Sequence, residues 1–253
     1  MAKSRAEPAA VPDRALGLRD YLDWSRDPAV GLFAILPLWL LYEGLRLSLM
    51  PHERNGAEFL LLRELQRLGP HGMTALRIAL ALAIFVAARS LLRRQVPWLK
   101  VGGLVVLEGT VYGILLGPVA SLLTSSAERV LAAGIGDATL VVNLVGSLGA
   151  GIFEELVFRL GLMSAIVWVG VRAVRAWALP PAAATLLVGA VAVVLSALVF
   201  SWFHHLCGEP FEARRFLFRT VAGVLLGLLM WVRGIGVCVY THALYDVHYY
   251  LTH

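Results

Sequence analysis

Charged residues are scarce in this chain of 253 residues: they make up only 15% of it, whereas 59% is hydrophobic. Average soluble proteins contain roughly 25% charged residues, so the composition excludes an ordinary soluble globular protein. Lysine is almost absent, since Lys3 and Lys100 stand alone, and the net charge of +5 therefore comes from arginine. A basic balance can indicate nucleic-acid binding. These arginines cluster between apolar runs, however, where they set membrane topology, so no nucleic-acid partner is expected.

Cysteine is equally scarce. Cys207 and Cys238 are too few for a disulfide framework, and neither belongs to a CxxC metal-binding pattern. The polar tail at residues 1–28 also lacks the apolar core of a cleaved signal peptide. We therefore expect the first apolar run to stay in the protein and to act as its own insertion signal.

Long apolar runs are abundant, at residues 29–50, 73–92, 101–123, 139–170, 182–206, 216–232 and 235–252. Lipid offers no hydrogen bonds to the backbone, and the runs are continuous rather than alternating, which favours helices and excludes a barrel. The expected fold class is all-α: a polytopic transmembrane helix bundle of about seven spans (six to eight). The segment from Ala57 to Leu68 is expected to add a short interfacial helix. Residues 29–253 are predicted to form a single membrane domain.

The distribution of lysine and arginine over the short connecting segments predicts the orientation. With the N-terminus inside, the inner segments hold more of these residues than the outer loops do. We therefore expect an integral membrane protein, in the bacterial inner (plasma) membrane, whose N-terminus is cytoplasmic.

Three ionisable residues in the middle of the fourth predicted span are the first sign of a functional site. Glu154, Glu155 and Arg159 would each cost about 2.5 to 3.5 kcal/mol at a helix centre if they had no partner. Glu155 and Arg159 stand four residues apart, with the glutamate first, which is the favourable order for a helical ion pair. Glu154 points about 100° away around an α-helix and needs a different partner.

Two later spans supply candidate partners. Phe200 and His204 stand one helical turn apart near the end of the fifth span, and His242 and Asp246 have the same spacing in the last one. A carboxylate gathered with imidazoles can take a proton from water and stabilise a developing oxyanion, which is the minimum needed to hydrolyse an amide. The same side chains could instead bind Zn²⁺.

These residues resemble the motifs of the CPBP family of intramembrane proteases, which includes the type II CAAX prenyl endopeptidases and bacteriocin-processing proteins. The family motifs are EExxxR, FxxxH and HxxxN or HxxxD, in that order on three helices. They match, in turn, Glu154 with Glu155 and Arg159, Phe200 with His204, and His242 with Asp246. The resemblance implies a protease core at about 139–252.

The resemblance implies that Glu154 and His204 activate the attacking water, and that His242 and Asp246 stabilise the oxyanion. The best-known prenyl proteases have asparagine at the last position, and an aspartate donates a hydrogen bond only when it is protonated. Asp246 is therefore expected either to be such a donor or to orient His242.

The resemblance also gives Glu155 and Arg159 a supporting role in bracing the fourth helix, together with Phe200. The family is often labelled as metalloproteases. Because the sequence lacks HExxH, we expect metal-free chemistry and assign no metal ligand; Zn²⁺ at Glu154, His204 and His242 is the alternative.

Other mechanisms and functions remain open. Gly134 to Asp137 imitates the GxGD motif of aspartyl intramembrane proteases, but its order relative to Tyr245-Asp246 is reversed. Cys207 or Cys238 could meet an imidazole and act as a thiol nucleophile. A non-catalytic immunity or scaffold protein could retain the polar cluster for packing. The expected substrate is a membrane-anchored protein or peptide, and the sequence does not identify it.

Overall fold

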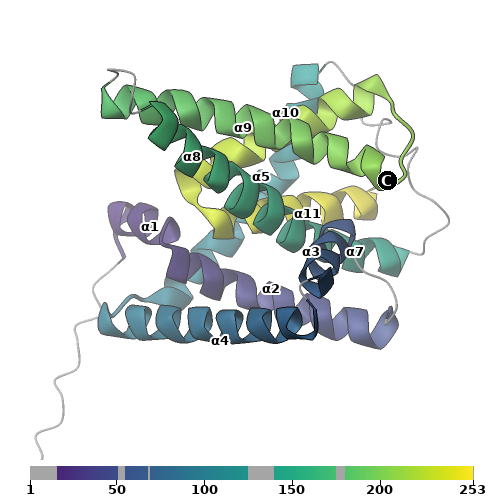
Figure 1. Cartoon of the computed structure of the whole chain (residues 1–253). Helices are drawn as coiled ribbons and strands as arrows, with labels where there is room; N and C mark the ends of the chain where they lie inside the picture. Colours follow the sequence, from purple (N-terminus) through teal and green to yellow (C-terminus); the bar gives the residue numbers. More distant parts are fainter. Residues whose placement is uncertain (1–15, 51–54, 68, 125–139, 175–179, 253) are drawn as a thin grey trace, which may run out of the picture.

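The computed structural model describes residues 16–50, 55–67, 69–124, 140–174 and 180–252, and these residues form helices and connections without a strand. Figure 1 shows them as one bundle. The helices, in chain order, are α1 (Leu18–Ser25), α2 (Pro28–Leu49), α3 (Gly56–Arg67), α4 (Pro70–Arg93), α5 (Trp98–Thr124), α7 (Leu140–Glu154), the π-helix η1 (Glu155–Met163), α8 (Ser164–Val174), α9 (Pro181–Leu206), α10 (Ala213–Arg233) and α11 (Ile235–Thr252). The all-α prediction is confirmed.

Six stretches within the described residues are long and apolar enough to cross a bilayer. They match the first six predicted spans, and the fourth is a single stretch of 35 residues that joins α7, η1 and α8. The seventh predicted span coincides with α11, which is helical but falls short of that apolarity. The protein is therefore an integral membrane protein, within the predicted range of six to eight spans.

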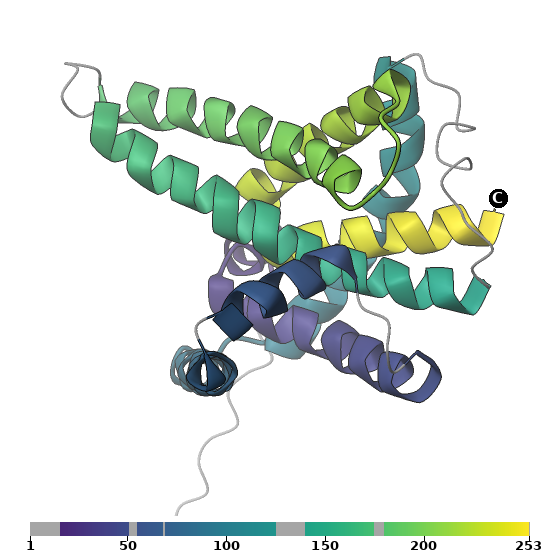
Figure 2. The same ribbon diagram turned by 45° about the vertical axis from the view of Figure 1, so that its right-hand side comes forward.

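The less apolar helix, α11, lies in the interior of the bundle. It packs along α5 and α7 and also contacts α2, α10 and η1, and every residue from Ile235 to Ala243 is buried. In Figures 1 and 2, α11 lies between α4 on one side and α9 on the other. Because protein rather than lipid surrounds it, α11 can hold polar side chains that a lipid-facing helix could not.

Glycines allow α5 and α7 to approach α11 closely. A Cβ atom added at Gly109 of α5 would lie 2.5 Å from the Tyr240 Cβ atom, and one at Gly151 of α7 would lie 2.5 Å from the Ala243 Cβ atom. Gly109 is followed at intervals of four residues by Gly113 and Gly117, the small-residue spacing of closely packed membrane helices. This packing sets the position of the side chains on α11 relative to those on α7.

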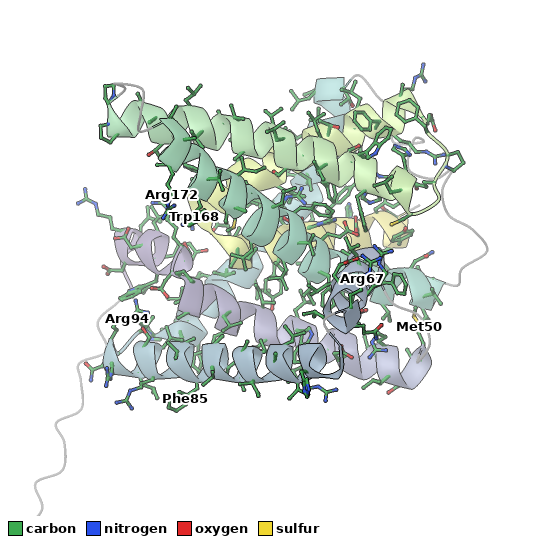
Figure 3. The ribbon with its side chains drawn as sticks, in the orientation of Figure 1. Met50, Arg67, Phe85, Arg94, Trp168 and Arg172 are labelled. Carbon is green, nitrogen blue, oxygen red and sulfur yellow. The ribbon has the colours of Figure 1, made fainter. Side chains whose placement is uncertain are left out.

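The outer helix α4 shows the opposite character. Its apolar side chains are mostly exposed, with Ala87 and Leu91 as the buried hydrophobic ones. Figure 3 shows Phe85 on its outer side, and that residue is 61% exposed. Such a surface is the one expected to contact lipid.

The helix predicted between the first two spans is present, and part of the predicted polar tail is also helical. The helix predicted from Ala57 to Leu68 is α3, and α1 lies within the tail predicted at residues 1–28. Tyr21 of α1 donates a hydrogen bond to Glu108 of α5, which also pairs with Arg233 at 2.6 Å. The charge of Glu108 inside the third span is thus compensated by protein groups.

Candidate active site

Glu154 is the last residue of α7, and it lies among side chains of α9, α11 and the segment directly before α3. Its Oε2 atom is 4.0 Å from Nε2 of His204 on α9 and 3.9 Å from Nε2 of His242 on α11. Its Oε1 atom accepts a hydrogen bond of 3.2 Å from Asn55 Nδ2. The separate partners that Glu154 was expected to need are therefore the imidazoles of His204 and His242 and the amide of Asn55.

The hydrogen bonds of His204 determine its tautomer. Its Nδ1 atom is 3.0 Å from the carbonyl oxygen of Phe200, one turn earlier in α9. A carbonyl can only accept, so Nδ1 is protonated and, in the neutral ring, Nε2 carries the lone pair. That lone pair faces the side on which Glu154 lies, so the two groups form a proton-accepting pair.

His242 is held from its other side by a buried ion pair. Its Nδ1 atom is 2.6 Å from Glu155 Oε1, and that same oxygen is 3.0 Å from Arg159 Nη1. The side chains of Glu155 and Arg159 are both 0% exposed. The predicted pair is thus formed, and it also fixes the orientation of the His242 ring, as carboxylates commonly do for histidines at active sites.

Phe200 joins these groups through its aromatic ring. The guanidinium of Arg159 lies over the ring, 4.3 Å from its centroid, and the rings of His204 and His242 meet it edge-on at 5.1 and 5.9 Å between centroids. A cation over an aromatic face is favourable, and more so when water is excluded. Phe200 therefore contacts Arg159, His204 and His242 and helps to hold all three side chains in place.

A cavity of about 390 Å³ brings the four predicted catalytic residues together: Glu154, His204, His242 and Asp246 all line it. Asp246 lies one turn after His242, with Oδ2 3.6 Å from His242 Nε2. The same cavity is lined by Glu209 and Arg219, which form an ion pair beside it. The catalytic roles of the four residues stay predictions, but their convergence is a property of the fold.

Two features of the site were not predicted from the sequence. The first is the π-helix, which begins at Glu155, directly after Glu154. A π-helix adds residues to each turn and so changes the angle between successive side chains, and such segments are frequent at functional sites. No residue pattern in the sequence marks this change.

The second missing feature is Asn55. Its place directly before α3, with Glu58 three residues later, fits a helix N-terminus. That pattern could have identified the cap, but nothing local could indicate contact with a residue 99 positions away.

The two cysteines do not resemble a thiol nucleophile. Cys238 is buried, and its thiol donates to Glu155 Oε2 at 2.9 Å rather than contacting a histidine. Burial raises the pKa of the Cys207 thiol, and the nearby Glu154 carboxylate acts in the same direction. Both environments disfavour the thiolate, which is the reactive form. The competing GxGD segment, with Asp137, lies outside the described residues.

The fit of the site to a metal ion can be tested by its donor geometry. Zn²⁺ bound about 2.0 to 2.2 Å from nitrogen and oxygen ligands brings those ligands closer together than the 3.9 and 4.0 Å that separate Glu154 Oε2 from the two imidazoles. Over the part of the chain that the structure describes, no group of three or more His, Cys, Asp or Glu side chains is arranged to hold a metal ion. The residues as placed do not fit Zn²⁺, and we derive no step through one.

Comparison with protein families matches residues 136–248 to the type II CAAX prenyl endopeptidase Rce1-like family. The match begins just before α7 and ends within α11, so it contains all four predicted catalytic residues and Glu155, Arg159 and Phe200. Comparisons with curated proteins and with solved structures found no match.

Proposed function

We propose that this chain, which belongs to the Rce1-like family of type II CAAX prenyl endopeptidases, is an intramembrane endopeptidase that hydrolyses a peptide bond with a water activated by Glu154 and His204. The observation that supports this proposal best is the separation of 4.0 Å between Glu154 Oε2 and His204 Nε2 beside the cavity. That separation is too long for a direct hydrogen bond and suits a bridging water.

A water about 2.8 Å from each atom would donate one O–H to the Glu154 carboxylate and the other to the free lone pair of His204 Nε2. Both of its protons would then be engaged, and its oxygen lone pairs would face the remaining space of the cavity. This is the arrangement that general-base catalysis requires of an attacking water.

His242 is suited to stabilise the oxyanion of the tetrahedral intermediate. To donate through Nε2 while Nδ1 donates to Glu155, the ring must be protonated on both nitrogens. Asp246 Oδ2, 3.6 Å from Nε2, would act as the counter-charge that keeps this cationic ring in place. A preorganised cation in a site of low dielectric is an effective stabiliser of a developing oxyanion.

The peptide bond is hydrolysed in two steps. The water oxygen bonds to the carbonyl carbon while one of its protons passes to the Glu154 carboxylate, and the carbonyl oxygen becomes the oxyanion beside His242. The carbon–nitrogen bond then breaks as the proton held by Glu154 passes to the leaving amine. Glu154 ends ionised, ready for the next water.

Metal-free chemistry is part of the proposal, because the distances of 3.9 and 4.0 Å from Glu154 Oε2 to the two imidazoles are longer than those between ligands of a tetrahedral Zn²⁺ site. A strong chelator tests this: activity should persist, whereas loss of activity that Zn²⁺ restores would replace this mechanism with a metal-dependent one.

The proposed substrate is a membrane-anchored protein or peptide. The cavity is lined by Met50 and Asn55, close to the end of α2 farther from the N-terminus, and by His204 and Glu209 near the end of α9. If the N-terminus is cytoplasmic, as the basic residues predict, this end of the bundle belongs to the outer half of the membrane.

We propose the bacterial inner membrane as the location of this protein.

Substituting Glu154→Gln in the full-length, membrane-embedded protein tests the function. The amide cannot accept the proton, so cleavage should fall at least 100-fold, because a general base contributes about 10²- to 10⁴-fold. Suitable readouts are a farnesylated peptide that ends in Cys-aliphatic-aliphatic-X and the set of new C-termini in membranes that express each variant. Glu64→Gln on the exposed face of α3 is the matched control and should retain activity.

Normal cleavage by a folded Glu154→Gln variant would contradict the proposal. If the wild type cleaves nothing while its biological effect survives the same substitution, the non-catalytic scaffold function is supported instead.

A further inference from the structure

The amide of Asn55 gives Glu154 a polar contact from the N-terminal part of the chain. Asn55 Nδ2 lies 3.2 Å from Glu154 Oε1, whereas the two histidines lie near Oε2. The two carboxylate oxygens thus have different partners. Asn55 also lies outside residues 136–248, the segment that matches the protease family.

The orientation of the Asn55 amide is fixed by a second hydrogen bond. Its Oδ1 atom accepts from the backbone N–H of Ala57 at 2.8 Å, which caps the N-terminus of α3. Because the carbonyl oxygen of the amide is used there, the NH₂ group is the part that faces Glu154. An ionised carboxylate has no proton to donate and can only accept. The Asn55 amide can therefore donate to Glu154 through its NH₂ group while its oxygen accepts from Ala57.

Tyr42 of α2 makes the cap of α3 rigid. Its hydroxyl donates to Glu58 Oε2 at 2.6 Å, and the backbone N–H of Asn55 lies close to the Tyr42 hydroxyl. In a capping box, the glutamate three residues after the cap would bind that N–H directly. Here the Tyr42 hydroxyl stands between the two, so the cap of α3 is tied to α2 rather than to α3 alone.

Tyr42 in turn packs against the helix that holds Glu154. A Cβ atom added at Gly149 of α7 would lie 2.6 Å from the Tyr42 ring, and the Tyr42 and Phe153 rings meet edge-on at 5.7 Å between centroids. The buried residues Ala57 and Glu58 hold the first turn of α3 against this surface. Asn55 is therefore supported on both α2 and α7 and is not a loosely placed loop residue.

We propose that Asn55 is a positioning residue: by donating to Glu154 Oε1, it turns the carboxylate so that Oε2 faces His204, His242 and the attacking water. This inference depends on the proposed function. A carboxylate without this donor can rotate about its last bond and present either oxygen at another angle, and positioning errors of this kind lower the rate of the chemical step. At metal sites, hydrogen bonds that orient the ligands typically change affinity or activity about 10- to 100-fold when removed, and we expect an effect of this size here.

The chain allows the two roles of Asn55 to be separated. Asn55→Ser and Asn55→Asp both keep a good N-cap for α3 but remove the donor to Glu154, while Asn55→Ala removes both. We expect kcat to fall about 10-fold or more in all three variants, with KM within about twofold of the wild type. The apparent Tm should fall clearly in Asn55→Ala and stay near the wild-type value in Asn55→Ser, which adds no second carboxylate beside Glu154. If Asn55→Ser and Asn55→Asp keep the wild-type kcat, Asn55 is only a cap and the proposal is overturned.

A measurement without substrate distinguishes failure of this proposal from failure of the proposed function. If Asn55 and Glu154 interact, the Tm changes of Asn55→Ser and Glu154→Ala should not add up in the double variant. Additive changes would contradict the contact whether or not the wild type cleaves any peptide. If the Tm changes are not additive but the wild type cleaves no peptide, the contact between Asn55 and Glu154 is supported and its catalytic role is not.

Discussion

The helices α4 and α11 show how differently the same bilayer acts on two parts of one molecule. The stretch Thr74–Arg93 of α4 has a mean hydropathy of 2.0 and is mostly exposed, while α11 does not reach the apolarity of a membrane span and is mostly buried. In a water-soluble protein the more apolar helix would be the buried one. Here lipid makes apolar residues necessary outside, and protein partners make polar residues possible inside.

The difference extends to how the two helices are held. The α4 helix contacts α2 and α3. It is followed directly by Arg94, which pairs with Asp27 at 2.5 Å and lies over the Trp24 ring. The α11 helix is surrounded on several sides, and its His242 joins a charge network that includes Glu155 and Arg159. Substitutions on or beside α11 should therefore have much larger effects than comparable substitutions on α4.

Removal of a charge gives the largest expected contrast. Glu155→Gln leaves the fully buried Arg159 without its carboxylate partner and should lower the free energy of unfolding by about 3 kcal/mol, the lower end for a broken buried pair. Arg77→Gln on the exposed face of α4 should change it by no more than about 0.5 kcal/mol. Thermal or denaturant unfolding in the same detergent measures both. Equal effects of the two substitutions would show that removing a charge from the interior of the bundle costs no more stability than removing one from its surface.

Addition of one methyl group tests the close packing around α11. In Gly109→Ala the new Cβ atom meets the Tyr240 Cβ atom at 2.5 Å, so α5 and α11 must separate, at a cost of about 1 to 3 kcal/mol. Gly103→Ala, on the same helix, meets nothing within 4 Å and should stabilise the protein by up to about 1 kcal/mol, since alanine favours helix. Unfolding curves for the two variants should shift in opposite directions. A shift of both in the same direction would contradict the close approach of α5 to α11 at Gly109.

The weakest contrast concerns the ion pair at the end of α4. The hydrogen bond from Arg94 holds the pKa of Asp27 below its usual range, helped by the backbone amides of Ala29 and Val30. A lowered pKa in the folded state means that the pair stabilises the protein above the unfolded pKa of about 3.9 and loses that contribution as pH falls further.

Asp27→Asn keeps the helix cap and removes the charge, so it should lower stability by less than about 1 kcal/mol at pH 7. The difference from the wild type should disappear in the acidic range where Asp27 becomes protonated. Apparent Tm values measured from pH 7 to pH 3 check this. A difference that persists unchanged to the lowest pH would show that the charge of Asp27 does not contribute.

Most of the helices could be predicted from sequence because each apolar run reports its own local environment. The spans of 29–50, 182–206 and 216–232 correspond closely to α2, α9 and α10. The pairing of Glu155 with Arg159 was equally local, since four residues separate them. Activation of water by Glu154 and His204, with His242 and Asp246 stabilising the oxyanion, was a hypothesis drawn from three separate motifs. The gathering of these residues at one cavity is what the structure adds.

The features that could not be predicted depend on packing between distant segments. The hydrogen bond from Asn55 to Glu154 joins residues 99 positions apart, and the π-helix at Glu155 has no local pattern of its own. The interior position of α11 follows from the glycines of α5 and α7, which act only where another helix lies against them.

By itself the sequence determined that this chain is a membrane helix bundle and which few polar residues lie inside it, because each buried charge must have a use or a partner. Only the tertiary structure decided which oxygen of Glu154 faces the histidines, which tautomer His204 adopts and which helix is surrounded by protein. Those properties are set by distances between segments far apart along the chain, and such distances are fixed only when the helices pack.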